Sequence, residues 1–220
     1  MRSENMLVKL KTFLMTPLIK LAVKHPDIMK SGWFLKVMSI FPARISKTYD
    51  QKIAASGYEY EAALVEGLKQ IPIKPRQIVD LATGTGFAAF KMAEAFPDAN
   101  IEAIDQAENM IKLAREKAKQ KEVENISFMT GNALALKSPD DKYDLLVTSN
   151  APVYLQEAGR VLKPGGYILV SFSFFGTAVA RARKDIIRFM ENNGFKLVEL
   201  RTAAKGAYIL GQRRKDLREL

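Results

Sequence analysis

The 220-residue sequence contains no cysteine and a single histidine, His25. The lack of cysteine excludes disulfides, thiolate metal sites and cysteine nucleophiles. One histidine cannot form a histidine cluster for zinc or a histidine dyad. We therefore predict no metal site, and we assign any acid–base chemistry to carboxylates, tyrosines, lysines or His25. Because the cysteine-free sequence also shows no signal-peptide pattern, we expect a cytoplasmic protein.

The sequence also has no long apolar run near its start. The longest uncharged stretch there extends from Thr12 to Ile19 and has eight residues, whereas a membrane-spanning helix needs roughly 20. We therefore predict no transmembrane helix.

Positive charge is concentrated at the N-terminal end. Residues 1–52 contain ten lysines and arginines against three acids, which gives +7 of the total net charge of +10. Leucines recur every three or four residues within 5–24, and residues 27–41 are rich in apolar and aromatic side chains. We predict an N-terminal helical segment, residues 1–56, that acts as a lid or contacts an anionic membrane surface. Packing on the rest of the protein and a homodimer interface are the alternatives.

Residues 57–220 form a second predicted unit in which strands and helices alternate. The expected strands are 77–82, 100–105, 126–129, 143–149, 167–173, 195–201 and 206–212. The expected helices are 57–70, 86–95, 107–120, 153–162 and 178–192, with a tight turn at 163–166. Alternation of this kind predicts a Rossmann-like α/β three-layer sandwich, in which a seven-stranded, mostly parallel sheet ends in an antiparallel C-terminal strand.

Acids and glycines cluster where the first two of these strands end. Asp80 closes the first strand, Gly84 and Gly86 follow in the turn, and Asp105 closes the next strand. Glycines allow the backbone to approach a ligand closely, and an acid at a strand tip can accept hydrogen bonds from both hydroxyls of a ribose. The pattern predicts a site for a nucleoside-bearing cofactor.

Five motifs occur in a fixed order along residues 57–212. They are Asp80–Gly86 (Asp-Leu-Ala-Thr-Gly-Thr-Gly), Asp105 with Met110 five residues later, 131–133 (Gly-Asn-Ala), Tyr143-Asp144, and 160–166 (Arg-Val-Leu-Lys-Pro-Gly-Gly). In this order they resemble the class I S-adenosylmethionine-dependent methyltransferases. The Ala-Thr-Gly-Thr-Gly form is similar to the branch of C-methyltransferases that act in ubiquinone and menaquinone biosynthesis.

The resemblance implies a cofactor, S-adenosyl-L-methionine, and a set of residues that bind it. These residues are Asp80, Ala82, Gly84, Gly86, Asp105, Gln106, Met110, Asn132, Ala133 and Ser149. Asp80 is expected to face the ammonium group, Asp105 the ribose hydroxyls, and Met110 the adenine ring. Asn132, with the backbone of Ala133, is expected to read the edge of the adenine.

Each role has a simpler alternative. The glycines can serve only the turn, and Asp105 can cap the helix that follows it. Met110 is equally well explained as a core residue, and Asn132 as a surface turn residue.

The acceptor site is predicted less directly. Ser149 and Asn150 are expected to border it, and Tyr49 to line it, so that Tyr49 and Asn150 are the predicted catalytic residues. If the acceptor must lose a proton, the candidate bases are Tyr49, Asp50, Tyr58, Tyr60 and His25.

The resulting hypothesis is a methyltransferase that acts on a small, lipophilic acceptor at the inner face of a membrane. Three alternatives are kept: an RNA methyltransferase that uses the basic N-terminal segment, a non-catalytic, membrane-associated protein that binds the cofactor, and a dehydrogenase. The last matches the pattern G-x-G-x-x-A at 84–89. However, Asp80 would repel a pyrophosphate, and the sequence has no Tyr-x-x-x-Lys pair.

Overall fold

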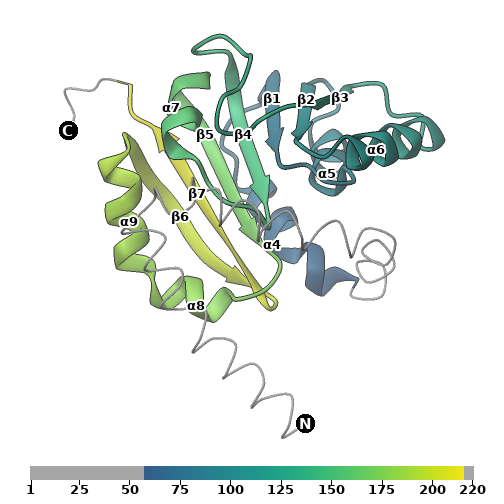
Figure 1. The fold of residues 1–220 in the computed structure, drawn as a ribbon. Coiled ribbons are helices and arrows are strands. Elements are labelled where there is room, and N and C mark those ends of the chain that lie inside the picture. Colours follow the sequence, from purple (N-terminus) through teal and green to yellow (C-terminus); the bar gives the residue numbers. More distant parts are fainter. Residues whose placement is uncertain (1–56, 216–220) are drawn as a thin grey trace, which may run out of the picture.

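A computed structural model of the protein describes residues 57–215 (Figure 1). A seven-stranded sheet has the order β3-β2-β1-β4-β5-β7-β6. Its strands are β1 (Gln77–Leu81), β2 (Asn100–Asp105), β3 (Ile126–Thr130), β4 (Tyr143–Ser149), β5 (Leu162–Phe172), β6 (Phe195–Ala203) and β7 (Gly206–Arg213). The helices are α4 (Tyr58–Lys69), α5 (Phe87–Ala95), α6 (Glu108–Gln120), α7 (Leu155–Val161), α8 (Gly176–Arg181) and α9 (Arg183–Asn192).

The strands β1 to β5 pair in parallel, whereas β7 runs antiparallel to both β5 and β6. Short strands rich in buried apolar residues suit a parallel sheet that is covered on both faces. β6 and β7 are joined directly, without a crossover helix, so they form a hairpin. The predicted fold class is therefore confirmed.

Two apolar cores lie on opposite faces of this sheet. On one face, α4, α5 and α6 pack against alternate strand residues such as Ile78, Ala103 and Val147. On the other face, α7, α8 and α9 pack against their neighbours in the strands, such as Val79 and Leu146. This alternation follows from the two-residue period of a strand, and it leaves the strand ends as the place where polar residues of several loops meet.

Two predicted elements were wrong in detail. The single helix expected at 178–192 is two helices, α8 and α9, which meet at the buried residue Ala182. The apolar spacing continues across this residue, so the sequence pattern does not reveal the break. The expected turn at 163–166 lies within β5, where the pairing steps from Tyr143↔Leu162 to Leu145↔Tyr167. Four residues of β5 therefore bulge opposite Asp144 alone.

The predicted N-terminal segment, residues 1–56, lies outside the described residues, as do Tyr49, Asp50 and His25. Within residues 57–215, no helix is long and apolar enough to cross a membrane.

Candidate active site

The candidate site lies at the carboxyl edge of the parallel strands. β1 lies between β2 and β4. The chain first adds β2 and β3 on one side of β1 and then crosses back to add β4 and β5 on the other side. A crevice forms at such a switch point in open α/β sheets, and ligands bind there. The loops that follow β1, β2, β4 and β5 all end at this edge.

Asp80 is the most unusual residue of the site. It is 1% exposed, and among residues 57–215 neither of its carboxylate oxygens has a partner in good hydrogen-bond geometry. Burial raises the pKa of Asp80 from its ordinary value of 3.8 to about 7, while the Thr83 hydroxyl and the Ala89 backbone amide nearby favour the charged form in part. The negative charge of Asp105 adds to the rise. Such a carboxylate is costly unless a cation is bound beside it.

The turn after β1 has three residues in the left-handed backbone region: Ala82 (φ 58°), Gly84 (φ 56°) and Gly86 (φ 88°). A Cβ on Gly84 would meet no atom of the described residues within 4 Å, so this side of the turn is open. A Cβ on Gly86 would lie 3.0 Å from the rings of Phe90 and Phe128. The structure therefore explains Gly86 by packing, whereas the space beside Gly84 is open.

Asp105 ties this turn to the next strand. Its Oδ2 accepts a hydrogen bond from the Gly84 N–H at 2.8 Å, and its Oδ1 accepts one from the Ala107 N–H at 2.9 Å. The N-cap residue of α6 is Ala107, and no side-chain cap hydrogen bond is present there, so the alternative role of Asp105 as a helix cap is not found. The role of Asp105 is instead to hold the loop before the helix. Each carboxylate oxygen can accept a second hydrogen bond, and ribose binding is therefore compatible with this role.

Replacing Asp105 with alanine is expected to destabilise the protein as well as to weaken the binding of a nucleoside. Two backbone N–H groups lose a charged acceptor, which typically costs about 1.5–3 kcal/mol each. Urea unfolding of both proteins measures this effect. A variant as stable as the parent would show that the two hydrogen bonds contribute little.

The remaining predicted cofactor residues surround the same edge. Met110 is buried near the start of α6, where a core role and contact with a flat ring are both possible, and Gln106 is exposed in the loop before it. Asn132 is exposed and accepts a hydrogen bond from the Leu134 N–H at 2.9 Å, so its carbonyl already serves its own turn. Ala133 is half-buried and packs against the apolar core between the sheet and helices α7, α8 and α9.

Asn150 is at the centre of a polar network beyond β4. Its Nδ2 donates to the Ser173 Oγ at 2.9 Å and to the Tyr60 hydroxyl at 3.2 Å. Its Oδ1 accepts from the Ser173 N–H at 2.8 Å. Ser149 accepts a hydrogen bond from the Ser171 hydroxyl at 3.0 Å. The side chain of Asn150 thus connects the end of β4 to the loop after β5 and to α4. Both of its polar atoms are hydrogen-bonded within the protein.

Sequence reasoning named Tyr60 only as one of several candidate bases and missed Ser173 and Phe174. Ser173 and Phe174 follow β5, where no motif marks them, and their place beside Asn150 depends on the pairing of β4 with β5. Thr148 was also missed. It is 1% exposed, and its hydroxyl has no hydrogen-bond partner in the part of the chain that the structure describes.

The Tyr143-Asp144 and Lys-Pro-Gly-Gly motifs have a structural role in this protein. Asp144 Oδ2 accepts the backbone N–H groups of Arg76 and Gln77, each at 2.9 Å, and Oδ1 accepts from Lys163 Nζ at 2.6 Å. Although burial opposes it, these donors lower the pKa of Asp144. The motifs therefore join the start of β1 to β4 and β5, at the edge opposite the candidate site.

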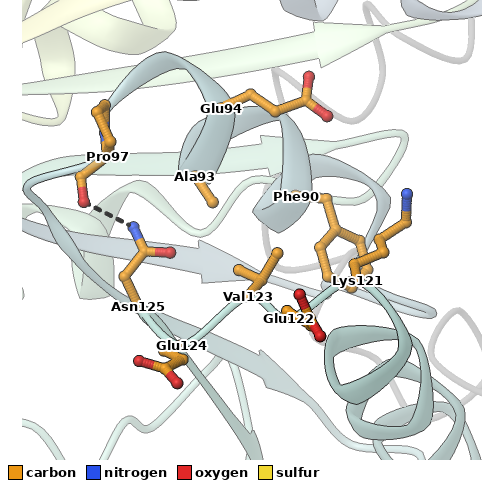
Figure 2. Close-up of a pocket in the computed structure, with 9 residues that line it drawn as sticks. All are labelled: Phe90, Ala93, Glu94, Pro97, Lys121, Glu122, Val123, Glu124 and Asn125. Carbon is orange, nitrogen blue, oxygen red and sulfur yellow. Dashed lines mark hydrogen bonds between the residues drawn. The ribbon is translucent and has the colours of Figure 1, made fainter.

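A groove of about 690 Å³ lies elsewhere, between the end of α5 and the loop from α6 to β3 (Figure 2). Its lining is Phe90, Ala93, Glu94, Pro97, Lys121, Glu122, Val123, Glu124 and Asn125. These residues precede β2 and β3, so the groove opens at the amino edge of the sheet and contains none of the predicted site residues. Among residues 57–215, no group of three or more potential metal ligands occurs.

Comparison with known proteins decides the family. The family profile described as "Methyltransferase domain" matches residues 74–201. The chain belongs to this family. Demethylmenaquinone methyltransferase of Listeria monocytogenes is 32% identical over 143 residues, which are 60% of each chain. Ubiquinone/menaquinone biosynthesis C-methyltransferase of Paracoccus denitrificans is 30% identical over 58% of this chain. The family predicted from the motifs is thus confirmed.

The chain spans about 60% of the length of the Listeria relative and 55% of the Paracoccus relative. Solved structures agree on the fold. A methyltransferase from Aquifex aeolicus, described as S-adenosylmethionine-dependent, has a TM-score of 0.62 at 19% identity over 78% of this chain and 98% of its own. One from Methanosarcina mazei has a TM-score of 0.55 at 17% identity over 68% of this chain and 97% of its own.

Proposed function

We propose that the protein is an S-adenosylmethionine-dependent methyltransferase that acts on a small, lipophilic acceptor. The observation that carries the proposal is Asp80, a buried carboxylate that forms no ion pair with residues 57–215, beside a turn in which Gly84 leaves an open face. The cofactor has an α-ammonium group, which would give this carboxylate a positive counter-charge. The residues at the site therefore fit the cofactor.

Each chain residue has a definite task in this proposal. Asp80 holds the ammonium group, and the turn at Gly84 approaches the ligand without a side chain. Asp105 accepts hydrogen bonds from the ribose, and Met110 and Asn132 border the adenine. The bound cofactor supplies an electrophilic methyl group on a sulfonium. Because that transfer is an in-line displacement, the protein has to align the acceptor and exclude water rather than provide a nucleophile.

The acceptor class is inferred from the relatives. The proteins matched in Listeria and Paracoccus are named for menaquinone and ubiquinone biosynthesis. We infer that the acceptor of this protein also has a flat, apolar ring, as a quinone has. Residues 1–56 are rich in both basic and apolar side chains, which supports access to such an acceptor from an anionic membrane surface.

Sedimentation of the protein with vesicles that contain phosphatidylglycerol tests this membrane contact, and binding to RNA in place of vesicles would contradict it. The mass in solution tests the alternative, a homodimer.

Titration calorimetry with S-adenosylmethionine and S-adenosylhomocysteine tests the proposed cofactor. Binding of both at micromolar to millimolar concentration is expected, and no heat from either at millimolar concentration would end the proposal. Incubation of cell extract with methyl-labelled cofactor then tests catalysis. A labelled lipid-soluble product is expected, and the absence of any labelled product would favour a non-catalytic protein that binds the cofactor.

A further inference from the structure

Three aromatic rings from distant parts of the chain lie in a row at the candidate site. Phe87 begins α5, directly after the glycine turn, and its ring centroid is 5.3 Å from that of Tyr60 in α4. Tyr60 is in turn 5.9 Å from Phe174, in the loop between β5 and α8. Both contacts are edge-to-face. The row therefore extends from the proposed cofactor turn to the loop after β5.

Phe174 forms the outer end of this row. Its side chain is 42% exposed, whereas Tyr60 is 6% exposed. The other large apolar side chains that the structure describes as exposed are Ile73, in the loop before β1, and Val198, in β6. Of these three, Phe174 is the one on a loop at the carboxyl edge of the parallel strands. An exposed aromatic residue beside a ligand crevice marks a surface that a ligand can cover.

The loop that carries Phe174 is fixed on both sides. Before it, Ser173 is buried and bonded to Asn150 through both its N–H and its Oγ. After it, the Gly176 N–H donates to the Lys205 carbonyl at 3.0 Å, and a Cβ on Gly176 would lie 2.1 Å from the Gly206 carbonyl oxygen. Between these points Phe175 has a φ of 68°, a conformation that a non-glycine residue keeps only when its surroundings impose it.

We propose that Phe174, supported by Tyr60, forms the wall against which the flat ring of the acceptor packs, and that Asn150 is the positioning residue that holds this wall. The proposal rests on the proposed function above and identifies residues that determine its acceptor specificity. A rigid loop presents the phenyl ring without loss of conformational freedom on binding, and aromatic rings stack favourably on flat apolar groups. Asn150 acts through Ser173 and Tyr60, since its own polar atoms are already bonded.

The test measures binding of 2-methyl-1,4-naphthoquinone to the full chain, with S-adenosylhomocysteine at saturation. The variant Phe174→Ala is expected to bind this probe about tenfold more weakly. Phe174→Leu, which keeps apolar volume but removes the ring, is expected to lose part of the affinity, and Phe174→Tyr to keep most of it. Val198→Ala shortens an exposed apolar side chain in β6, 47% exposed against 42% for Phe174, and is the control, with no expected change.

A double-mutant cycle tests the role of Asn150. If Asn150 acts by holding the loop, Asn150→Ala alone weakens binding of the naphthoquinone, and adding Phe174→Ala costs little more. Losses that simply add would contradict the positioning role. A merely structural defect is recognised because it would also lower the affinity for S-adenosylhomocysteine, which both single variants are expected to keep.

The outcomes separate this inference from the proposed function. If the parent protein does not bind S-adenosylhomocysteine, the proposed function itself fails. If it binds S-adenosylhomocysteine but not the naphthoquinone, or if Phe174→Ala and Phe174→Leu both bind the naphthoquinone like the parent, the aromatic wall is wrong and the proposed function stands.

Discussion

At pH 8, the variant Asp80→Asn is expected to be more stable than the parent protein by about 4 kcal/mol, because a rise in pKa from 3.8 to about 7 corresponds to this free energy. The sign follows from linkage. Between pH 4 and 7 the folded protein keeps the proton that the unfolded chain releases, so the free energy of unfolding falls as the pH rises. Asp80→Asn has no carboxyl group to titrate at this position, so its stability lacks this pH dependence.

Urea unfolding at several pH values measures the effect. The free energy of unfolding of the parent is expected to fall steadily from pH 4 to 7, and that of Asp80→Asn is expected not to show this fall. Near pH 4 the two proteins are expected to have similar stability. Asp98→Asn is a suitable control, since Asp98 is largely exposed and forms only a long ion pair of 3.9 Å with the exposed Arg76 among the described residues. Equal stability of parent and Asp80→Asn at pH 8 would show that Asp80 is not held as a costly charge.

The same substitution is expected to weaken cofactor binding. If Asp80 holds the ammonium group, loss of its charge costs about 1.5–3 kcal/mol, which is at least about tenfold in affinity. Binding to the parent near pH 6 should also release a proton, because the cation favours the ionised carboxylate. Calorimetry in buffers with different ionisation enthalpies detects this proton. Asp80→Asn would thus become more stable and less active at once, as is common for residues that are kept for function.

Gly84→Ala is expected to abolish most cofactor binding, with a loss in affinity of at least about tenfold, although it introduces no clash with the protein. A Cβ at this position would meet no atom of residues 57–215 within 4 Å, yet it would occupy the open face of the turn. The φ of 56° adds a strain of about 1–2 kcal/mol for any residue other than glycine.

Gly194→Ala is the matched control for this strain. Gly194 also has a positive φ, 82°, and open space at its Cβ position, but it follows α9, on the other face of the sheet. Both variants should lose similar stability in urea, and only Gly84→Ala should lose affinity for S-adenosylhomocysteine. If the two variants bind equally well, the open face of Gly84 does not contact the cofactor.

Both experiments concern residues that the sequence already indicated, and the structure changes what is expected of them. Asp80, near the end of β1, was predicted to face an ammonium group. Its burial, which raises its pKa, arises only in the folded protein, where the backbone of Ala89 in α5 lies beside its carboxyl group. The two glycines of the turn look equivalent in the sequence. Packing of Phe90 and Phe128 separates them, because these rings fill the space beside Gly86 alone.

For Asn150, the sequence predicted a catalytic role, whereas the structure shows that its side chain is bonded to other protein residues. Its place after β4 led to its prediction as a catalytic residue. In the structure its side chain binds Ser173, 23 residues later, and Tyr60, 90 residues earlier. No spacing in the sequence encodes these contacts, because they arise only when β5 pairs with β4 and α4 covers the same edge.

Local patterns along the chain were sufficient to predict the alternation of strands and helices, the two strand-end acids, the glycine turn and the family to which they belong. These features are local, since strand period, turn chemistry and motif spacing act over a few residues. The folded arrangement is needed to know which acid is fully buried, which glycine has an open side, and which aromatic side chains meet. Each of these depends on elements that are distant in the chain and adjacent only in the folded sheet.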